Sequence, residues 1–372
     1  VMRIGFDAKR AFCNFRGLGN YSRNTFFALT ENFPENDYYL FTPESKPEFA
    51  ALTYPHAQKI MPRHQWLGAC WRSCGCKREI RHFQLDLYHG LSHELPLGIE
   101  RTRTKTVVTI HDLIFLTHPH LYPWLDRKLY EKKYYRSAAV ADKIIAISQQ
   151  TKLDLMEWWK IPEEKIAVVY QGCSPQFLQV CPEEKLQEVR QKYHLPSQYL
   201  LHVGTVERRK NQEVIVRAMK EGRLDMPLVL AGRHTDYVKD LWAIDADFVR
   251  QNVIFLDHFA DEDLPAIYQN ASLFIYPSLY EGFGIPILEA LSSRLPVITS
   301  EGRCLREAGG EGALYISATD SEQLAVSIFN VLQDSNLRQE LVARGTRQIQ
   351  QFTPHAIAQN LMKVYRGVKN EE

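Results

Sequence analysis

The feature that most constrains this sequence is an alternation of short apolar segments with stretches of helical character. In the first half, six segments have the composition of buried strands: residues 2–7, 38–42, 85–90, 106–112, 143–148 and 166–172. Helical patterns lie between them, for example over residues 20–32 and 124–140. This alternation predicts parallel β-sheets covered by helices on both faces.

The alternation stops near the middle of the chain and then starts again. Residues 173–185 contain Pro175 and Pro182 and have no clear period, which is typical of a linker. Further strand-like segments follow at residues 199–204, 227–232, 253–259, 273–278 and 296–300, with a helix from residue 211. A chain of 372 residues exceeds the size at which one hydrophobic core stops growing. We therefore expect two α/β domains, residues 1–180 and 181–353, and a final helix over residues 354–368.

The composition describes an ordinary globular protein, with 45% hydrophobic and 24% charged residues. No apolar run reaches the roughly 18 residues that cross a bilayer, and the N-terminal segment lacks a signal peptide's apolar region. These features predict a cytoplasmic protein whose seven cysteines are reduced thiols. Cys70, Cys74 and Cys76 have no fourth ligand at zinc-site spacing, so we expect no metal site.

The net charge of +1 is unevenly distributed along the chain. Residues 1–190 hold 26 Lys and Arg against 21 Asp and Glu, whereas residues 191–372 hold 19 against 23. Ordinary scatter is one interpretation, and a basic N-terminal half that faces a phosphorylated acceptor or a membrane is the other. Residues 64–83 and 122–137 mix Trp and Tyr with Lys and Arg. Such segments can rest on an anionic membrane, or can bury their tryptophans beneath a solvated basic face.

Two motifs of the first half fall where ligands bind in open parallel sheets, at the carboxyl ends of strands. Gly17 and Gly19 precede a helix but lack the third glycine of the dinucleotide fingerprint, which disfavours an NAD-dependent dehydrogenase. His111 and Asp112 end the buried strand segment over residues 106–112. His111 could donate a hydrogen bond to a ligand or act as an acid or base near neutral pH, or it could be a structural histidine.

Three consecutive basic residues follow a strand segment of the second half. Arg208, Arg209 and Lys210 come shortly after Gly204, where the strand over residues 199–204 ends. A bidentate guanidinium and a mobile ammonium at such a position suit a diphosphate. A solvated run of charges is the alternative.

Two glutamates flank a glycine-rich turn near residue 280. Glu281 precedes the turn and Glu289 lies in an otherwise apolar helical pattern after it. A carboxylate in such a pattern needs a polar partner, such as vicinal hydroxyls. The free N–H groups that open this helix, at Phe283, Gly284 and Ile285, can approach an anion closely. We therefore predict that the carboxylates bracket a bound polyol while the turn holds phosphate.

Taken together, these motifs resemble those of the retaining glycosyltransferases with the GT-B fold, which is built from two Rossmann-like doubly wound parallel-sheet domains facing across a cleft. The resemblance covers nearly the whole chain and includes bacterial mannosyltransferases. It rests on "YPSLYEGFGIPILEALSSRLPVITS", "VGTVERRKN", "TIHDLIF" and the glycine loop, in that family's order. It also implies that the final helix, residues 354–372, crosses back to the first domain.

The resemblance implies a role for each matching residue of the second half. Glu281 would contact hydroxyls of the transferred sugar, and Glu289 the ribose hydroxyls of the nucleotide. Arg209 and Lys210 would bind the diphosphate, with help from Arg208. One departure is Thr205, because many relatives have an arginine directly after the glycine that corresponds to Gly204. The diphosphate contacts would then shift to Arg209 and Lys210.

Further implied roles concern both halves. His111 would hydrogen-bond the donor sugar, and Gly19 would lie by the phosphates. The backbone amides of Phe283, Gly284 and Ile285 would complete the donor site. In related mannosyltransferases the base is read after the strand that corresponds to residues 253–259, so Phe259 would line the base pocket and Asp261 would accept from guanine.

The resemblance implies a metal-independent hexosyltransferase that retains anomeric configuration. The acceptor hydroxyl would attack from the face that the nucleoside diphosphate leaves, and no metal is required if Arg209 and Lys210 neutralise the charge. We expect GDP-mannose as donor and a glycan or lipid-linked acceptor of surface polysaccharide synthesis, with no nucleic acid partner and no cofactor. The enzyme would be cytoplasmic. Peripheral contact of the enzyme with the inner face of the membrane is left open. A UDP-sugar-dependent transferase, a nucleotide-sugar epimerase and a non-enzymatic binding module remain alternatives.

Overall fold

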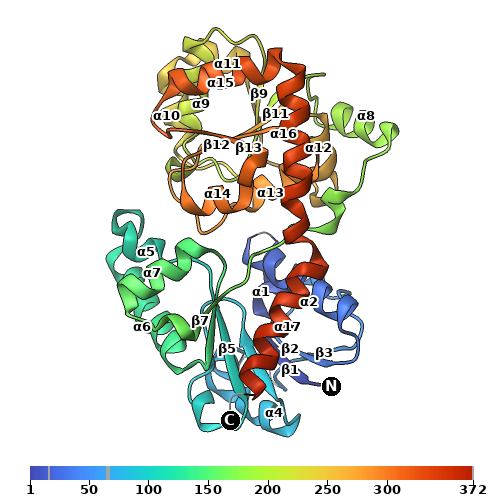
Figure 1. Ribbon diagram of the computed structural model, residues 1–372, viewed down its shortest axis with the longest axis vertical. Coiled ribbons are helices and arrows are strands. Elements are labelled where there is room, and N and C mark those ends of the chain that lie inside the picture. The colour runs from blue at the N-terminus through green and yellow to red at the C-terminus, as the bar shows by residue number, and fades with distance from the viewer. Residues whose placement is uncertain (16, 64–67, 371–372) are drawn as a thin grey trace. The chain divides into compact units, whose positions relative to one another are not determined.

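The chain divides into two compact units, each built around one parallel sheet (Figure 1). The computed structural model describes residues 1–15, 17–63 and 68–370. The first unit comprises Val1–Gly172 and Phe352–Glu372, and the second comprises Cys173–Gln351. Residues 173–180, which we assigned to the N-terminal domain from the sequence, cluster with the second unit.

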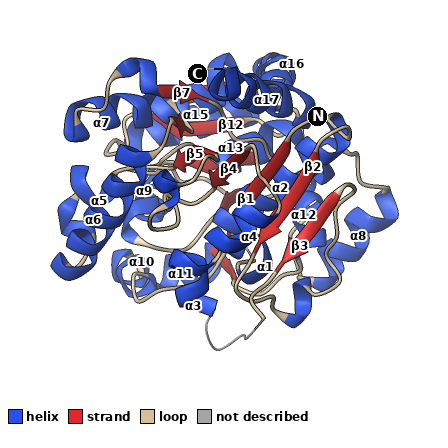
Figure 2. Ribbon diagram, turned by 90° about the horizontal axis from the view of Figure 1, so that it is seen from below, coloured by secondary structure: helices blue, strands red, loops and turns tan. Residues whose placement is uncertain are grey.

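The first unit contains a seven-stranded parallel sheet in the order β3-β2-β1-β4-β5-β6-β7. Its strands are β1 (Arg3–Asp7), β2 (Asp37–Phe41), β3 (Ala57–Ile60), β4 (Leu87–Gly90), β5 (Lys105–Ile110), β6 (Lys143–Ala146) and β7 (Ile166–Val168). Figure 2 shows β1, β2 and β3 side by side. The strand order reverses between β1 and β4, which pair from Ile4 with Leu87 to Phe6 with His89. Open α/β sheets bind ligands at such a reversal.

Helices cover the sheet of the first unit. They are α1 (Lys9–Cys13), α2 (Leu18–Asn32), α3 (Gly68–Cys70), α4 (Lys77–His82), α5 (Ile114–Thr117), α6 (Trp124–Val140), α7 (Gln149–Trp159) and the C-terminal α17 (Pro354–Asn370), with a π-helical turn over Trp71–Gly75. The helix α17 shares a core with α2, β1 and β2, in which Leu361 and Tyr365 pack with Phe6 and Tyr38. Buried Tyr365 also hydrogen-bonds His89, with 2.7 Å between the hydroxyl and Nδ1.

The second unit contains a six-stranded parallel sheet in the order β10-β9-β8-β11-β12-β13. Its strands are β8 (Leu200–Val203), β9 (Leu228–Ala231), β10 (Val253–Leu256), β11 (Leu273–Tyr276), β12 (Val297–Ser300) and β13 (Ala313–Ile316). Every residue of β8, β9, β11 and β12 is buried, as expected of strands covered on both faces. Here the strand order reverses between β8 and β11. The prediction of two doubly wound parallel-sheet domains is therefore confirmed.

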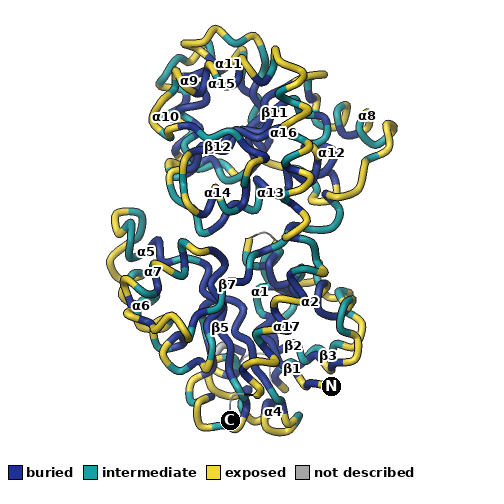
Figure 3. Tube along the Cα trace, viewed as in Figure 1, coloured by how far each residue is buried: buried dark blue, intermediate teal, exposed yellow. Residues whose placement is uncertain are grey.

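Amphipathic helices enclose the core of the second unit. They are α8 (Glu183–Lys192), α9 (Gln212–Glu221), α10 (Val238–Ile244), α11 (Ala246–Asn252), α12 (Leu264–Asn270), α13 (Ile285–Ser292), α14 (Arg303–Gly309), α15 (Ser321–Gln333) and α16 (Ser335–Gln348). Figure 3 shows buried strands in dark blue and exposed outer turns of the helices in yellow. Side chains of Asp320 and Asp334 cap α15 and α16 by accepting hydrogen bonds from backbone amides of the first turn.

Two strands, β3 and β13, are absent from the sequence-based prediction. Both are outermost strands, so each pairs with only one neighbour. Only one of the four residues of β3 is fully buried, and two of the four residues of β13 are half-buried. The mixed composition of β3 fits this partial burial and conceals it from a search for continuous apolar runs, whereas the apolar segment ALYI of β13 is a signal that the prediction missed.

Candidate active site

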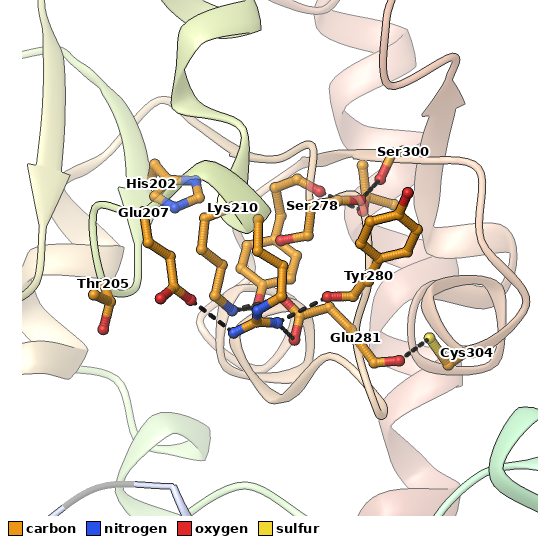
Figure 4. Close-up of polar contacts among 12 residues, drawn as sticks. His202, Thr205, Glu207, Lys210, Ser278, Tyr280, Glu281, Ser300 and Cys304 are labelled. Carbon is orange, nitrogen blue, oxygen red and sulfur yellow. Dashed lines mark hydrogen bonds and ion pairs between the residues drawn. The ribbon is translucent and has the colours of Figure 1, made fainter. Parts of the chain in front are cut away.

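Three of the predicted residues of the second unit meet at the reversal between β8 and β11: Arg209, Lys210 and Glu281. The chain leaves β8 through Gly204 and forms a 3₁₀ turn at Arg208–Lys210 before α9 begins. It leaves β11 at Tyr276 and reaches α13 through a loop that contains Glu281. Since β8 and β11 are paired neighbours, both loops lie at the same edge of the sheet (Figure 4).

Glu281 is the centre of a partly buried ionic network. Lys210 Nζ lies 2.5 Å from Glu281 Oε1, and Arg209 Nη1 lies 2.7 Å from Oε2. The Tyr276 hydroxyl donates to Oε1 at 2.9 Å and accepts a hydrogen bond from Lys210. Arg209 also donates to Glu207 Oε1 at 2.8 Å, so two cations and two carboxylates form one cluster.

The network fixes the charge state of Glu281. Burial alone raises the pKa of this carboxyl, but Lys210 and Arg209 outweigh burial and lower its pKa to about 2. Burial also lowers the pKa of the Lys210 ammonium from its ordinary value, and the attraction of Glu281 opposes that shift. Glu281 is therefore a carboxylate at neutral pH, held between two cations.

The rings of His202 and Tyr276 form a buried pair next to this network. The imidazole of His202 stacks on Tyr276 with 5.6 Å between ring centroids. His202 Nδ1 donates to the carbonyl of Ile275 at 2.9 Å, so Nε2 accepts from Gln212 Nε2 at 3.0 Å. Burial lowers the pKa of His202 to about 4, and the ring is neutral at pH 7.

Sequence reasoning missed His202, Tyr276 and Gln212. A signal existed, since a histidine and a tyrosine near the ends of otherwise apolar strands need polar partners.

The loop that carries Glu281 is held on both sides by hydrogen bonds to its backbone. Ser300 Oγ donates to the carbonyl of Ser278 at 2.5 Å, and the amide of Leu279 donates to the carbonyl of Arg209 at 2.9 Å. Cys304 Sγ lies 3.2 Å from the carbonyl oxygen of Glu281. These contacts position the carboxylate without using its side-chain oxygens.

The helix α13 begins beside this loop. Its first residue is Ile285, Pro286 follows, and Gly284 precedes it with φ +136°, a conformation that favours glycine. Among the described residues, no side chain caps this helix start. Glu289 is 8% exposed and accepts a hydrogen bond from the Tyr268 hydroxyl at 2.8 Å. The sequence predicts a polar partner for Glu289, and the Tyr268 hydroxyl is one such partner.

The other predicted residues of the second unit differ in their exposure and in their partners. Arg208 is 72% exposed and pairs with Asp240 at 2.5 Å, so its guanidinium does not join the network. Thr205 is half-buried and its carbonyl accepts from Gln212. Phe259 is half-buried, and Asp261 is exposed at the start of a 3₁₀ turn, Asp261–Asp263.

His111 and Gly19 belong to the first unit. His111 is buried; its Nε2 donates to the carbonyl of Leu91 at 2.8 Å, and its Nδ1 lies 3.1 Å from Gln171 Nε2. Burial lowers the pKa of His111 to about 4, so it is not the near-neutral acid or base that the sequence suggested. The helix α2 begins at Leu18, so Gly19 lies inside it rather than ahead of it. A Cβ at Gly19 would come 2.0 Å from the carbonyl oxygen of Asn14, which explains the glycine by close packing.

The described residues contain no cluster of metal ligands and no helix that could span a membrane. Within residues 1–15, 17–63 and 68–370, no group of three or more His, Cys, Asp or Glu side chains could hold a metal ion. Cys70 and Cys74 are exposed and Cys76 is buried. None of the helices in these ranges is long and apolar enough to cross a membrane.

Comparison with known proteins identifies the family. The family model of glycosyl transferases group 1 matches residues 186–348, and that of Glycosyltransferase Family 4 matches residues 17–177. The O-antigen chain mannosyltransferase B of Escherichia coli is 33% identical over 320 residues, which cover 83% of this chain and 82% of that protein. This chain belongs to the group 1 glycosyltransferases.

Two further similarities bear on this group 1 glycosyltransferase. The serotype-specific mannosyltransferase WbdA of Escherichia coli is 29% identical over 71% of this chain, although the match covers only 34% of WbdA. The crystal structure of the Anabaena protein HepE in complex with UDP-glucose superposes with a TM-score of 0.74 at 16% identity, covering 99% of this chain and 100% of that one. The predicted GT-B fold is thereby confirmed.

Proposed function

We propose that this glycosyltransferase moves mannose from GDP-mannose to a glycan or lipid-linked acceptor in surface polysaccharide synthesis, with retention of anomeric configuration. The observation that carries the proposal is the network of Glu281 with Arg209 and Lys210 at the strand reversal of the second unit. It presents fixed cations where a diphosphate binds in such sheets. The similarity to O-antigen mannosyltransferase B supports mannose as the sugar.

In the proposed reaction the acceptor hydroxyl attacks the anomeric carbon from the face that the nucleoside diphosphate leaves. The bond from that carbon to the phosphate oxygen breaks as the bond to the acceptor oxygen forms. The hydroxyl proton passes to a phosphate oxygen of the departing group. The protein contributes positioning and charge stabilisation, since Arg209, Lys210 and the N-terminus of α13 would face the negative charge that develops on the diphosphate.

The ionic network prepares these cations before the donor arrives. Glu281 and Glu207 hold Arg209 on two sides, and Glu281 with Tyr276 holds Lys210. Preorganised charges need little reorientation when the diphosphate leaves, which is where electrostatic catalysis gains most. In this proposal Arg209 and Lys210 contact the diphosphate directly, and no divalent ion is assigned a role. We therefore expect turnover to continue in excess EDTA, and a loss restored by Mg²⁺ or Mn²⁺ would contradict this part of the proposal.

The test is incubation with a panel of nucleotide sugars that includes GDP-mannose and UDP-glucose. Release of nucleoside diphosphate only when a glycan acceptor is present, with an α-linked product by NMR, would support the proposal. Preference for UDP-glucose would favour the alternative suggested by the fold neighbour solved with that donor. Altered free sugar nucleotide without acceptor would indicate an epimerase, and binding without turnover would indicate a binding module.

Glu289→Ala is expected to weaken binding of the free nucleoside diphosphate by about tenfold, because ribose hydroxyls would lose a buried acceptor. Isothermal titration with GDP measures this effect. Tyr268→Phe is the matched control, since it removes only the hydroxyl that donates to Glu289 Oε2. An affinity that is unchanged in Glu289→Ala would show that the carboxylate is structural.

We further propose that the helix α6 rests on an anionic membrane that displays the lipid-linked acceptor. Trp124 is 61% exposed and Leu125 is 72% exposed, and basic residues such as Lys128 follow them on the same helix. Exposed residues colour much of α6 in Figure 3. In the other aromatic segment, Trp71 is buried, whereas residues 64–67 lie outside the described residues. Of the described residues in these two segments, Trp124 of α6 is the exposed tryptophan, whereas Trp71 is buried.

Sedimentation with vesicles that contain phosphatidylglycerol at low salt tests this proposal. We expect wild-type protein to bind, and the double variant Trp124→Ser/Leu125→Ser to lose most of that binding, because the exposed apolar contact is removed. Phe329→Ser is the matched control, since Phe329 is 56% exposed on α15 of the other unit. Equal sedimentation of wild type and the double variant would argue against a membrane role for α6.

A further inference from the structure

One asparagine joins the turn that carries the cations to two other loops of the second unit. Asn211 directly follows Arg209 and Lys210 and precedes the first residue of α9. Its side-chain Nδ2 donates to the carbonyl of Pro277 at 3.1 Å and to the carbonyl of Ala318 at 2.7 Å. Pro277 follows the last residue of β11, and Ala318 lies two residues after the end of β13. The side chain therefore connects the segments that leave three strands, β8, β11 and β13.

The backbone of Asn211 adopts a left-handed conformation, with φ +59° and ψ +38°. Residues other than glycine are uncommon in this region, and asparagine is among those that enter it most readily. Glycine would adopt the same conformation at lower cost, so the backbone alone does not explain an asparagine here. The two hydrogen bonds of Nδ2 supply a reason for the side chain, because an amide NH₂ group can donate to two carbonyls at once.

The position of Lys210 depends on how its turn lies against β11. Both of its hydrogen-bond partners, the Tyr276 hydroxyl and the Glu281 carboxylate, belong to β11 or to the loop that follows it (Figure 4). Asn211, the next residue along the chain, is bonded to the same stretch at Pro277. A lysine ammonium is carried on a flexible four-carbon chain, so its location is defined only when its backbone and its partners are both fixed. The Asn211 side chain fixes the backbone.

We propose that Asn211 is a positioning residue for the transfer reaction: its side-chain amide holds the backbone of Lys210 against β11, so that the ammonium lies where the diphosphate leaves. The inference rests on the proposed function, because it takes over the role given there to Lys210. It adds a residue that acts through Lys210 rather than on the substrate. The alternative is that Asn211 only stabilises the fold.

Asn211→Gly tests the proposal, because glycine keeps the left-handed backbone and removes both donors. We expect kcat, measured well below the melting temperature, to fall by about tenfold or more, since a small misplacement of a catalytic group is costly. The reaction of Lys210 with trinitrobenzenesulfonate, followed by peptide mass spectrometry, should become faster by about fivefold, because local opening of the turn exposes the amine. In wild type the Lys210 side chain is only 10% exposed.

Asn211→Asp is the second variant, in case the glycine variant does not fold. Aspartate has the size of asparagine and also tolerates a left-handed backbone, but its carboxylate donates no hydrogen bond. It should change kcat and the labelling of Lys210 in the same directions.

Two control variants separate positioning from general stability. Asn270→Ala removes a buried asparagine of the same unit, whose Nδ2 donates to the carbonyl of Leu186 at 3.0 Å and whose Oδ1 accepts from Arg190 at 2.7 Å. It should lower the melting temperature and leave the labelling of Lys210 unchanged. Arg223→Gly replaces an exposed left-handed residue, with φ +49°, just after α9. It should change neither kcat nor labelling.

The outcomes distinguish the proposal from its alternative. Wild-type kcat in a folded Asn211 variant would overturn it, whether or not the labelling of Lys210 changes. Labelling that is equally faster in Asn270→Ala would also overturn it, because the effect would then follow from lost stability. If wild type turns over no nucleotide sugar, the proposed function fails separately, and the labelling still decides whether Asn211 holds Lys210 in place.

Discussion

Lys210→Ala is expected to lower kcat with the preferred nucleotide sugar by about 10²-fold or more. The variant removes a buried cation from the position where negative charge develops on the leaving diphosphate, and losses of this size follow when one preorganised donor is removed. Steady-state release of nucleoside diphosphate at saturating donor and acceptor measures the effect. Lys210→Arg is not a neutral replacement, since the larger guanidinium must fit beside Tyr276 and Glu281.

Arg208→Ala is the matched control for this experiment. Arg208 precedes Arg209 in the same 3₁₀ turn and carries the same charge, but it is exposed and pairs with Asp240. Its removal should change kcat by less than about twofold, since exposed ion pairs contribute little. A Lys210→Ala enzyme with wild-type kcat would reject the assignment of Lys210 to the diphosphate. Equal losses in both variants would indicate a general effect of surface charge.

Glu281→Ala is expected to lower the free energy of unfolding by about 3–5 kcal/mol, the usual cost of removing one partner of a buried ion pair. Lys210, which is 10% exposed in its side chain, would lose its carboxylate partner. Arg209 would keep Glu207 and the carbonyl of Tyr280. Urea unfolding followed by tryptophan fluorescence and circular dichroism measures the change.

The double variant Lys210→Met/Glu281→Leu separates stability from catalysis. Replacing both members of a buried pair by apolar side chains of similar size is often neutral for stability, whereas removing one member is not. We therefore expect the double variant to regain most of the stability lost in Glu281→Ala and to remain inactive. A double variant as unstable as the single one would show that the pair has further structural partners. Recovered activity would contradict the catalytic assignment.

The pH dependence of unfolding follows from the same carboxyl. The pKa of Glu281 falls from an ordinary 4.5 to about 2 on folding. A group whose pKa is depressed by folding contributes stability that is fully present above its unfolded pKa and is lost as pH falls toward the folded pKa. Wild type should therefore lose more stability than the Lys210→Met/Glu281→Leu variant between pH 4.5 and pH 2.

Local patterns in the sequence determined the fold class and singled out three residues that the structure brings together, Arg209, Lys210 and Glu281. The alternation of strands and helices is readable because burial on both faces of a parallel sheet demands continuous apolar runs. Arg209, Lys210 and Glu281 could be singled out because they follow such runs, at strand ends where polar residues serve ligands. The structure brings these three into direct contact, as their positions after β8 and β11 required.

Tertiary structure alone decided which of the candidate groups are paired and which are available. Arg208 is next to Arg209 in sequence, yet it pairs with Asp240 across another loop. His111 follows β5, and only packing shows that both of its ring nitrogens are bonded within the first unit. The physical reason is that strand periodicity and turn chemistry act over a few residues. Hydrogen-bond partners, burial and pKa depend instead on side chains that folding brings together from distant parts of the chain.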